Sequence, residues 1–146
     1  MAPGPLATPV DIMIGPDESL GIMPCTGTYY HLVKRVDPLD PMDFRSQVQQ
    51  GRSPRGPRAR DPKYLRQWNG VSVHDTLEQS RHHAEYFAWK IGDIIAQLVI
   101  PEGTEITYER VGDGGHGVLY NTDPVVLVSY VTGAVRAREL AEGNEE

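Results

Sequence analysis

Residues 70–100 read GVSVHDTLEQSRHHAEYFAWKIGDIIAQLVI, and this stretch determines the fold that we expect. Residues 70–73 are led by glycine and carry two valines, which is typical of a short strand. Thr76 with Gln79 three residues later fits a capping box, and Leu77–Ile91 repeats apolar residues at helical spacing until Gly92. Ile94–Ile100 then has the length and branching of a buried strand. The stretch therefore predicts strand, helix and strand in direct succession.

The flanking segments add further strands and one shorter helix. Residues 29–36 and 125–131 are rich in aromatic and β-branched side chains, and residues 104–111 and 117–120 flank a glycine-rich turn, which predicts a hairpin. Asp40-Pro41 resembles an N-cap with proline at the first helical position, so we expect a second helix over residues 41–50. The fold class that follows is α+β: a single domain with a mixed or antiparallel sheet and two helices.

Length and composition limit the domain and its surroundings. The chain has 146 residues and one cysteine, Cys25, which excludes an internal disulfide. We expect a flexible Pro- and Gly-rich arm over residues 1–25, the α+β domain over 26–132, and an acidic, frayed tail over 133–146. The longest apolar run, Ile94–Ile100, is far shorter than the ~20 residues of a membrane helix, so we expect no membrane partner. A reducing interior such as bacterial cytoplasm is the expected location.

The charge is distributed unevenly along the chain. The segment from Lys34 to Arg66 holds nine of the fourteen basic residues and four acidic ones, a net charge of +5, whereas the rest carries −11. Guanidinium groups match phosphate oxygens, so this segment could bind a pyrophosphate or a nucleic-acid backbone. The alternative is a solvated loop. The arginines concerned are Arg52, Arg55, Arg58 and Arg60.

Several residues follow one another in the order of a known family. His31 lies in the first expected strand, Ser72 in the later glycine-led strand, and Asp75 precedes a helix that carries Ser80 and His83. In this order, roughly residues 29–132 resemble the ADP-ribosyltransferase fold of poly-ADP-ribose polymerases, RNA phosphotransferases and RES toxins. The family's first-strand histidine is followed by glycine, where this chain has leucine. The family's stacking tyrosine is replaced here by histidine.

The resemblance implies that NAD is the ligand and substrate. It implies that His31 holds the ribose, that Ser72 and His83 frame the nicotinamide, and that a carboxylate, Glu109 or Asp123, stabilises an oxocarbenium-like state. An active domain would then transfer ADP-ribose or cleave NAD. The sites expected from this chain are His31, Glu109 and Asp123 for catalysis, and His31, Ser72, His83, Arg52 and Arg55 for the cofactor.

A second hypothesis comes from a different class of protein. Tyr86 and Trp89 fall on the polar side of the helical wheel, so they could form, with the basic segment between Arg52 and Arg66, a non-catalytic surface for a protein or nucleic acid. The absence of a glutamate at the start of the last expected strand favours this alternative. Asp75, Glu78 and His82 share a helical face like a carboxylate–imidazole site, but this face is opposite the apolar one, and we expect no metal there.

Overall fold

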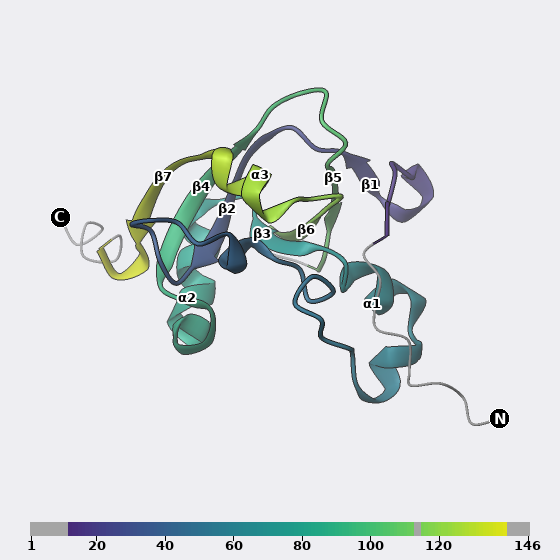
Figure 1. Ribbon diagram of the computed structural model, residues 1–146. Coiled ribbons are helices and arrows are strands. Elements are labelled where there is room, and N and C mark those ends of the chain that lie inside the picture. Colours follow the sequence, from purple (N-terminus) through teal and green to yellow (C-terminus); the bar gives the residue numbers. More distant parts are fainter. Residues whose placement is uncertain (1–11, 113–114, 140–146) are drawn as a thin grey trace.

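The computed structural model describes residues 12–112 and 115–139 and shows an antiparallel sheet with helices on both faces (Figure 1). The seven strands lie in the order β1-β5-β6-β3-β2-β4-β7, and every pairing is antiparallel. The strands are β1 (Ile22–Pro24), β2 (Gly27–Val33), β3 (Val71–His74), β4 (Ile94–Ile100), β5 (Thr107–Arg110), β6 (His116–Tyr120) and β7 (Val131–Arg136). The helices are α1 (Pro62–Gln67), α2 (Leu77–Ile91), α3 (Pro124–Ser129) and the 3-10 turns η1 (Glu18–Leu20), η2 (Pro41–Phe44) and η3 (Gly56–Arg60). The expected single α+β domain is confirmed.

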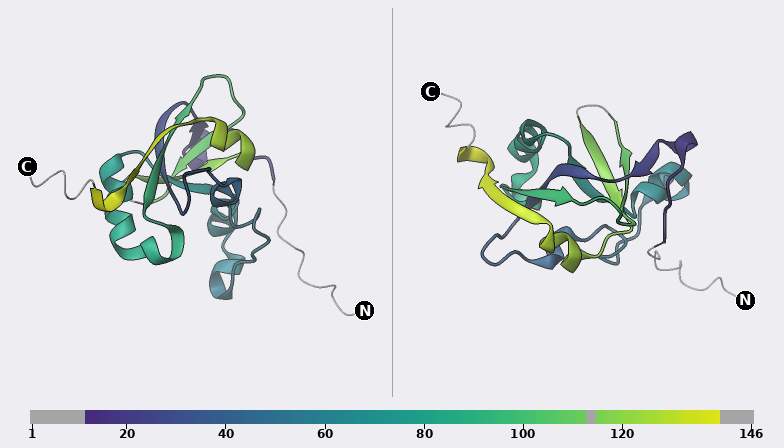
Figure 2. Two further views of the ribbon diagram at one scale, coloured as in Figure 1. Left: turned by 60° about the vertical axis from the view of Figure 1, so that its left-hand side comes forward. Right: turned by 90° about the horizontal axis from the view of Figure 1, so that it is seen from above.

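Both faces of the central strands are buried, because helices cover the sheet on opposite sides. Seen from above, α2 lies on one side of the strands and α3 on the other (Figure 2). Ile95 of β4 packs with Ala84 of α2, whereas its neighbour Ile94 packs in the cluster that contains Phe44 of η2 and Leu127 of α3. Successive side chains of a strand point to opposite faces, so the run of β4, which is apolar except for Gln97, fits a strand covered on both sides.

The sheet is split between β2 and β3. β2 pairs with β4 through seven residue pairs, and β3 pairs with β6 through four. Between β2 and β3, a single pair joins Tyr30 to His74. The sheet therefore consists of two half-sheets, β7-β4-β2 and β3-β6-β5-β1, which meet at this one pair and diverge beyond it.

Helix α2, strand β4 and the β5–β6 hairpin are confirmed, whereas the last expected strand is wrong. Helix α2 and strand β4 begin and end where the sequence indicates, and the hydroxyl of Thr76 accepts a bond from the Gln79 amide at 3.2 Å, as a helix cap does. β5 and β6 form the expected hairpin. Residues 125–131 were expected as the last strand, but α3 occupies most of them, because Asp123 accepts bonds from the Val125 and Val126 amides and Pro124 fits the first turn.

The sheet extends past both expected limits of the domain. Residues 1–25 were expected to be a flexible arm, but Ile22–Pro24 forms β1 and pairs with β5. Residues 133–146 were expected to be a frayed tail, but β7 runs to Arg136 and pairs with β4, and Ala137 is buried. The expected arm also contains the turn η1 and the buried Ile14. Residues 1–11 and 140–146 of the two expected segments lie outside the described residues.

In the basic segment from Lys34 to Arg66, the first half has less helix than expected and the second half has more. The helix expected over residues 41–50 is reduced to η2, since Arg45 takes an extended conformation after Asp40 has capped the first turn. The segment expected as an extended loop instead contains η3 and α1, and Asp61 caps α1 by accepting a bond from the Lys63 amide. Three α-helices are present in the described part of the chain rather than the expected two.

Candidate functional site

A cavity of about 520 Å³ opens where the two half-sheets diverge. Its walls come from the end of β2, from β3, from one residue of α2, and from the segment that runs from η2 to the basic loop. The cavity combines polar, charged and aromatic side chains. His31 and Lys34 line the cavity on the β2 side, Ser72 and His74 line it on β3, and His83 lines it on α2. The opposite wall includes Asp40, Asp43, Arg45, Gln47 and Arg52.

His31 bridges the split in the sheet. Its Nδ1 lies 2.6 Å from the carbonyl oxygen of Ser72 in β3, and its Nε2 lies 2.6 Å from the carbonyl oxygen of Asp43 in η2. Both ring nitrogens are thus engaged by main-chain carbonyl groups. The ring of Phe44 lies 5.1 Å away, centre to centre. The imidazole of His31 therefore ties β2 to β3 and to η2.

Ser72 and His83 reach the same cavity from other elements. Ser72 alternates along β3 with the core residues Val71 and Val73, so its side chain points toward the α2 side. Its hydroxyl lies 3.3 Å from Nε2 of His116. His83 stacks on Phe87 with ring centres 4.6 Å apart. Three side chains expected at the cofactor site, those of His31, Ser72 and His83, thus line one cavity.

Two further histidines, which the sequence interpretation missed, complete a cluster around Ser72. The ring centre of His74 lies 5.2 Å from that of His83 and 5.3 Å from that of His116, and the last two are 6.3 Å apart. His74 and His116 are opposite one another in the β3–β6 register. Period-two alternation from Ser72 would have placed His74 on the same face, but the pairing with His116 needs the sheet topology.

Burial keeps this cluster uncharged at neutral pH. Burial, with added repulsion from His116, His83 and His31, lowers the pKa of His74 to about 4. Burial also lowers the pKa of His83, with contributions from His116 and His82, and burial alone lowers the pKa of His116. The cluster of His74, His83 and His116 therefore presents neutral imidazoles near pH 7.

Glu109 lies in a different part of the sheet from the cavity. Its side chain, 3% exposed, receives two bonds from the guanidinium of Arg66, at 2.9 and 2.8 Å, and one from the hydroxyl of Tyr120 at 2.6 Å. Burial raises the pKa of Glu109, but hydrogen bonds from Arg66, Tyr120 and Gln67 outweigh it and bring the pKa below its ordinary value. This carboxylate is charged, and it fixes α1 to the β5–β6 hairpin.

Asp123, the other carboxylate expected to act in catalysis, caps α3 and is not among the residues that line the cavity. Two other carboxylates do line it. Asp40 accepts a bond from the Met42 amide at 2.9 Å, and Asp43 accepts one from the Lys34 amide at 3.0 Å. Each of these carboxylates keeps an oxygen that is not used in these bonds.

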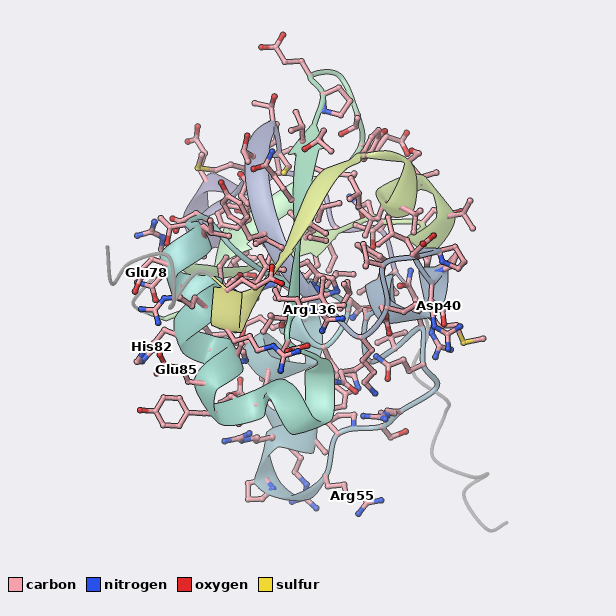
Figure 3. All side chains as sticks on the ribbon, turned by 90° about the vertical axis from the view of Figure 1, so that its left-hand side faces the viewer. Asp40, Arg55, Glu78, His82, Glu85 and Arg136 are labelled. Carbon is pink, nitrogen blue, oxygen red and sulfur yellow. The ribbon has the colours of Figure 1, made fainter. Side chains whose placement is uncertain are left out.

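The two arginines expected at the cofactor site separate in the structure. Arg52 lines the cavity, whereas Arg55 lies before η3 and extends away from the body of the protein (Figure 3). Lys34, Arg45 and Arg52 on the lining outnumber the two aspartates there. The described lining of the cavity therefore has a positive balance of formal charge.

The outer face of α2 carries ion pairs between neighbouring side chains. Glu78, His82 and Glu85 point away from the sheet (Figure 3), and Arg81 pairs with both glutamates. Asp75 pairs instead with Arg110 at 2.9 Å. Among the described residues, no group of three His, Cys, Asp or Glu side chains is arranged to hold a metal ion.

Comparisons with known proteins find no relative of this chain. No protein-family model matches it, and neither the curated proteins nor the solved structures contain a match. No helix in the described part of the chain combines the length and the apolar character that crossing a membrane requires.

Proposed function

We propose that the cavity between β2 and β3 binds NAD or a related nucleotide, in the manner of an ADP-ribosyltransferase-like domain. One observation carries the proposal: His31, Ser72 and His83 come from three separate elements and line a single cavity. These are the residues to which the family resemblance assigns the ribose and the nicotinamide.

The size and charge of the cavity support a nucleotide of negative charge. A volume of about 520 Å³ lies within the range of small-molecule sites, which is roughly 300–1,000 Å³. Lys34, Arg45 and Arg52 provide cations for phosphate oxygens. The imidazole rings of His74 and His83 offer flat surfaces on which a planar base or a nicotinamide could stack.

The structure changes one detail of the expected contacts. The resemblance assigns the ribose to His31, but both nitrogens of this ring are already engaged by protein carbonyls. A ribose hydroxyl would have to replace the Asp43 carbonyl as the acceptor, which means that the η2 segment would shift when the ligand binds. Ser72 needs no such change, since its exposed hydroxyl is held by one long bond to His116.

Cleavage of NAD would require a carboxylate beside the bond that joins ribose to nicotinamide. Asp40 and Asp43 are the carboxylates on the cavity lining, and they take the place of Glu109 and Asp123 in the proposal. Their negative charge would stabilise the positive charge that develops on the sugar. The proposal is thus binding of NAD first, with cleavage or ADP-ribose transfer as the reaction that this geometry would support.

Titration calorimetry with NAD, ADP-ribose and nicotinamide tests the proposal. His83→Ala should weaken NAD binding at least about tenfold, because it removes a ring from the cavity wall. His82→Ala is the matched control, since the neighbouring histidine lies on the outer face of the same helix (Figure 3). No heat of binding from NAD or ADP-ribose at millimolar concentration would refute the proposal, and so would equal effects of the two variants. Release of nicotinamide from NAD, followed by chromatography, then separates a binding domain from an enzyme.

A second function is favoured by the charge of the basic segment. Among the described residues, no ion pair uses Arg52, Arg55, Arg58 or Arg60, and the guanidinium of Arg58 lies over the ring of Tyr64 at 5.2 Å. Arginines with no acidic neighbour are available to an anionic partner. We therefore also propose that this segment binds a nucleic-acid backbone or an acidic protein. Tyr86, which is 63% exposed on α2, would belong to the same type of surface, while the side chain of Trp89 lies outside the described residues.

A further inference from the structure

The histidine cluster beside Ser72 has ring nitrogens that no other described residue uses. Nδ1 of His74 lies 2.9 Å from the buried hydroxyl of Ser80, and Nε2 of His116 lies 3.3 Å from the exposed hydroxyl of Ser72. No hydrogen bond within the described residues engages Nε2 of His74, Nδ1 of His116 or either nitrogen of His83. Within the described part of the chain, these nitrogens are therefore available to a ligand.

The rings are close enough to act on one ligand group and too close to carry several charges. Their centres are separated by 5.2, 5.3 and 6.3 Å. At such separations, two protonated imidazoles repel each other strongly in a partly buried site. One proton shared with a bound anion would relieve both the repulsion and the cost of burial.

Among the residues that the structure describes, the charged groups around the cluster leave it without a carboxylate of its own. From the turn before α2, Asp75 is paired with Arg110 of β5. From α2, His82 lies on the outer face, 3.8 Å from Glu85. On the β2 and η2 side, the ring of His31 and the cation of Lys34 line the cavity, with Asp40 and Asp43 on the wall beyond them.

The cations of the far wall, Arg45 and Arg52, complete these surroundings. Among the described residues, no ion pair joins a carboxylate to His74, His83 or His116. An anion from solution is therefore the partner that would stabilise a protonated ring in this place.

We propose that His74, His83 and His116 form a subsite for a phosphoryl group, and that the cluster takes up one proton when the anion binds. For its natural ligand this inference rests on the proposed function, because the diphosphate bridge is the anionic part of NAD. The site itself is defined by the imidazoles and requires only a tetrahedral oxyanion. Phosphate affinity at this subsite then rises as the pH falls.

The physical reason is linkage between protonation and binding. In the free protein, burial lowers the pKa of all three rings, so they are neutral near pH 7. An anion within hydrogen-bonding distance favours the charged form and raises the pKa of the ring that it contacts. Between the lower pKa of the free site and the higher pKa of the bound site, the affinity increases about tenfold for each unit of falling pH.

Histidine titration by NMR tests the subsite with sulfate, an anion that keeps its charge between pH 4.5 and 8. The ring signals of the full chain are followed in sodium sulfate and in sodium chloride of equal ionic strength, with each signal assigned from a single His→Gln variant. Sulfate should raise the midpoint of at least one of His74, His83 and His116 by about one pH unit or more, which corresponds to tenfold preference for the protonated form. His82, exposed on the same helix, is the internal control. Equal midpoints in the two salts, or equal shifts in all the histidines, would overturn the inference.

ADP-ribose as a second probe separates this inference from the proposed function. Its diphosphate is a diester whose charge does not change in this range, so a change of affinity with pH reports on the protein. Binding of ADP-ribose that is independent of pH and moves no midpoint would refute the subsite and leave the proposed function intact. A sulfate-induced shift without binding of ADP-ribose or NAD would support the subsite and refute the nucleotide.

Discussion

Replacement of Glu109 by glutamine should destabilise the fold and leave the cavity intact. The carboxylate is 3% exposed, and it receives both bonds of the Arg66 fork and the bond from Tyr120. A glutamine of the same size would set an N–H group against one of these donors and would leave the guanidinium without a counter-charge. Breaking a buried pair in this way costs roughly 3–5 kcal/mol. Since the Arg66 side chain is 18% exposed and water can solvate part of it, we expect about 3 kcal/mol.

Urea unfolding followed by circular dichroism measures this loss, and thermal melting should show a decrease of roughly 6–12 °C. Tyr120→Phe is the graded comparison, because it removes one hydrogen bond to a charged group and should cost about 1.5–3 kcal/mol. The pKa of Glu109 is lowered in the folded state, so its stabilising effect is present above its ordinary value of 4.5 and is lost as the pH falls through the folded value. The deficit of Glu109→Gln should therefore shrink below about pH 4. If Glu109→Gln unfolds with a free energy within about 0.5 kcal/mol of the wild type and no longer binds NAD, the structural role of Glu109 is refuted and its catalytic role is restored.

Three further predictions concern other parts of the chain. Gly92→Ala should lower the free energy of unfolding by about 3 kcal/mol or more, since a Cβ there would lie 2.1 Å from the Val33 carbonyl oxygen. Gly103→Ala, with open space around it and a similar positive φ, should lower it by about 1 kcal/mol. Equal urea midpoints of the two variants would contradict this prediction. The free energy of unfolding should fall as the pH drops from about 6.5 to 4, by up to about 1.4 kcal/mol per pH unit for each histidine, because the unfolded chain binds protons that the native His74 does not. His74→Gln should flatten the dependence of the urea-derived free energy on pH. An unchanged slope would exclude His74 as the cause. Replacing four arginines with serine should abolish binding of a single-stranded oligonucleotide, measured by anisotropy at low salt, with the melting temperature nearly unchanged; a large loss of stability would instead make the loop structural. The four are Arg52, Arg55, Arg58 and Arg60.

Local signals predicted the centre of the fold well. In α2 and β4, capping, periodicity and apolar content all indicate the same element, and the structure agrees with them to the residue. In residues 125–131, by contrast, the local signals indicate different elements. Their β-branched side chains favour a strand, but Asp123-Pro124 is a helix start of the same kind as Asp40-Pro41, and in the folded chain the cap outweighs the weak propensity of the side chains.

Non-local pairing accounts for what the sequence could not show. Nothing in residues 131–136 has the pattern of a buried strand, because β7 is an edge strand with mostly exposed side chains that pairs only with β4. The candidate site divides in the same way. His31, Ser72 and His83 were identified by their order along elements that could be recognised locally. The contact between His74 and His116 depends on the β3–β6 register, and the ion pair of Glu109 with Arg66 depends on where α1 packs.

The single residue pair between β2 and β3 has a consequence for the mechanics of the domain. In a continuous sheet, the spacing of neighbouring strands is held near 4.8 Å by the ladder of main-chain bonds. Here the Tyr30–His74 pair is the one ladder pair between the described parts of β2 and β3, and beyond it the half-sheets are joined by the imidazole of His31, the ring of Phe44 and the packing of Val33 with Val71 and Val73. The width of the cavity is therefore controlled by side chains, so a mutation at His31 or Phe44 would change its dimensions without breaking a ladder bond.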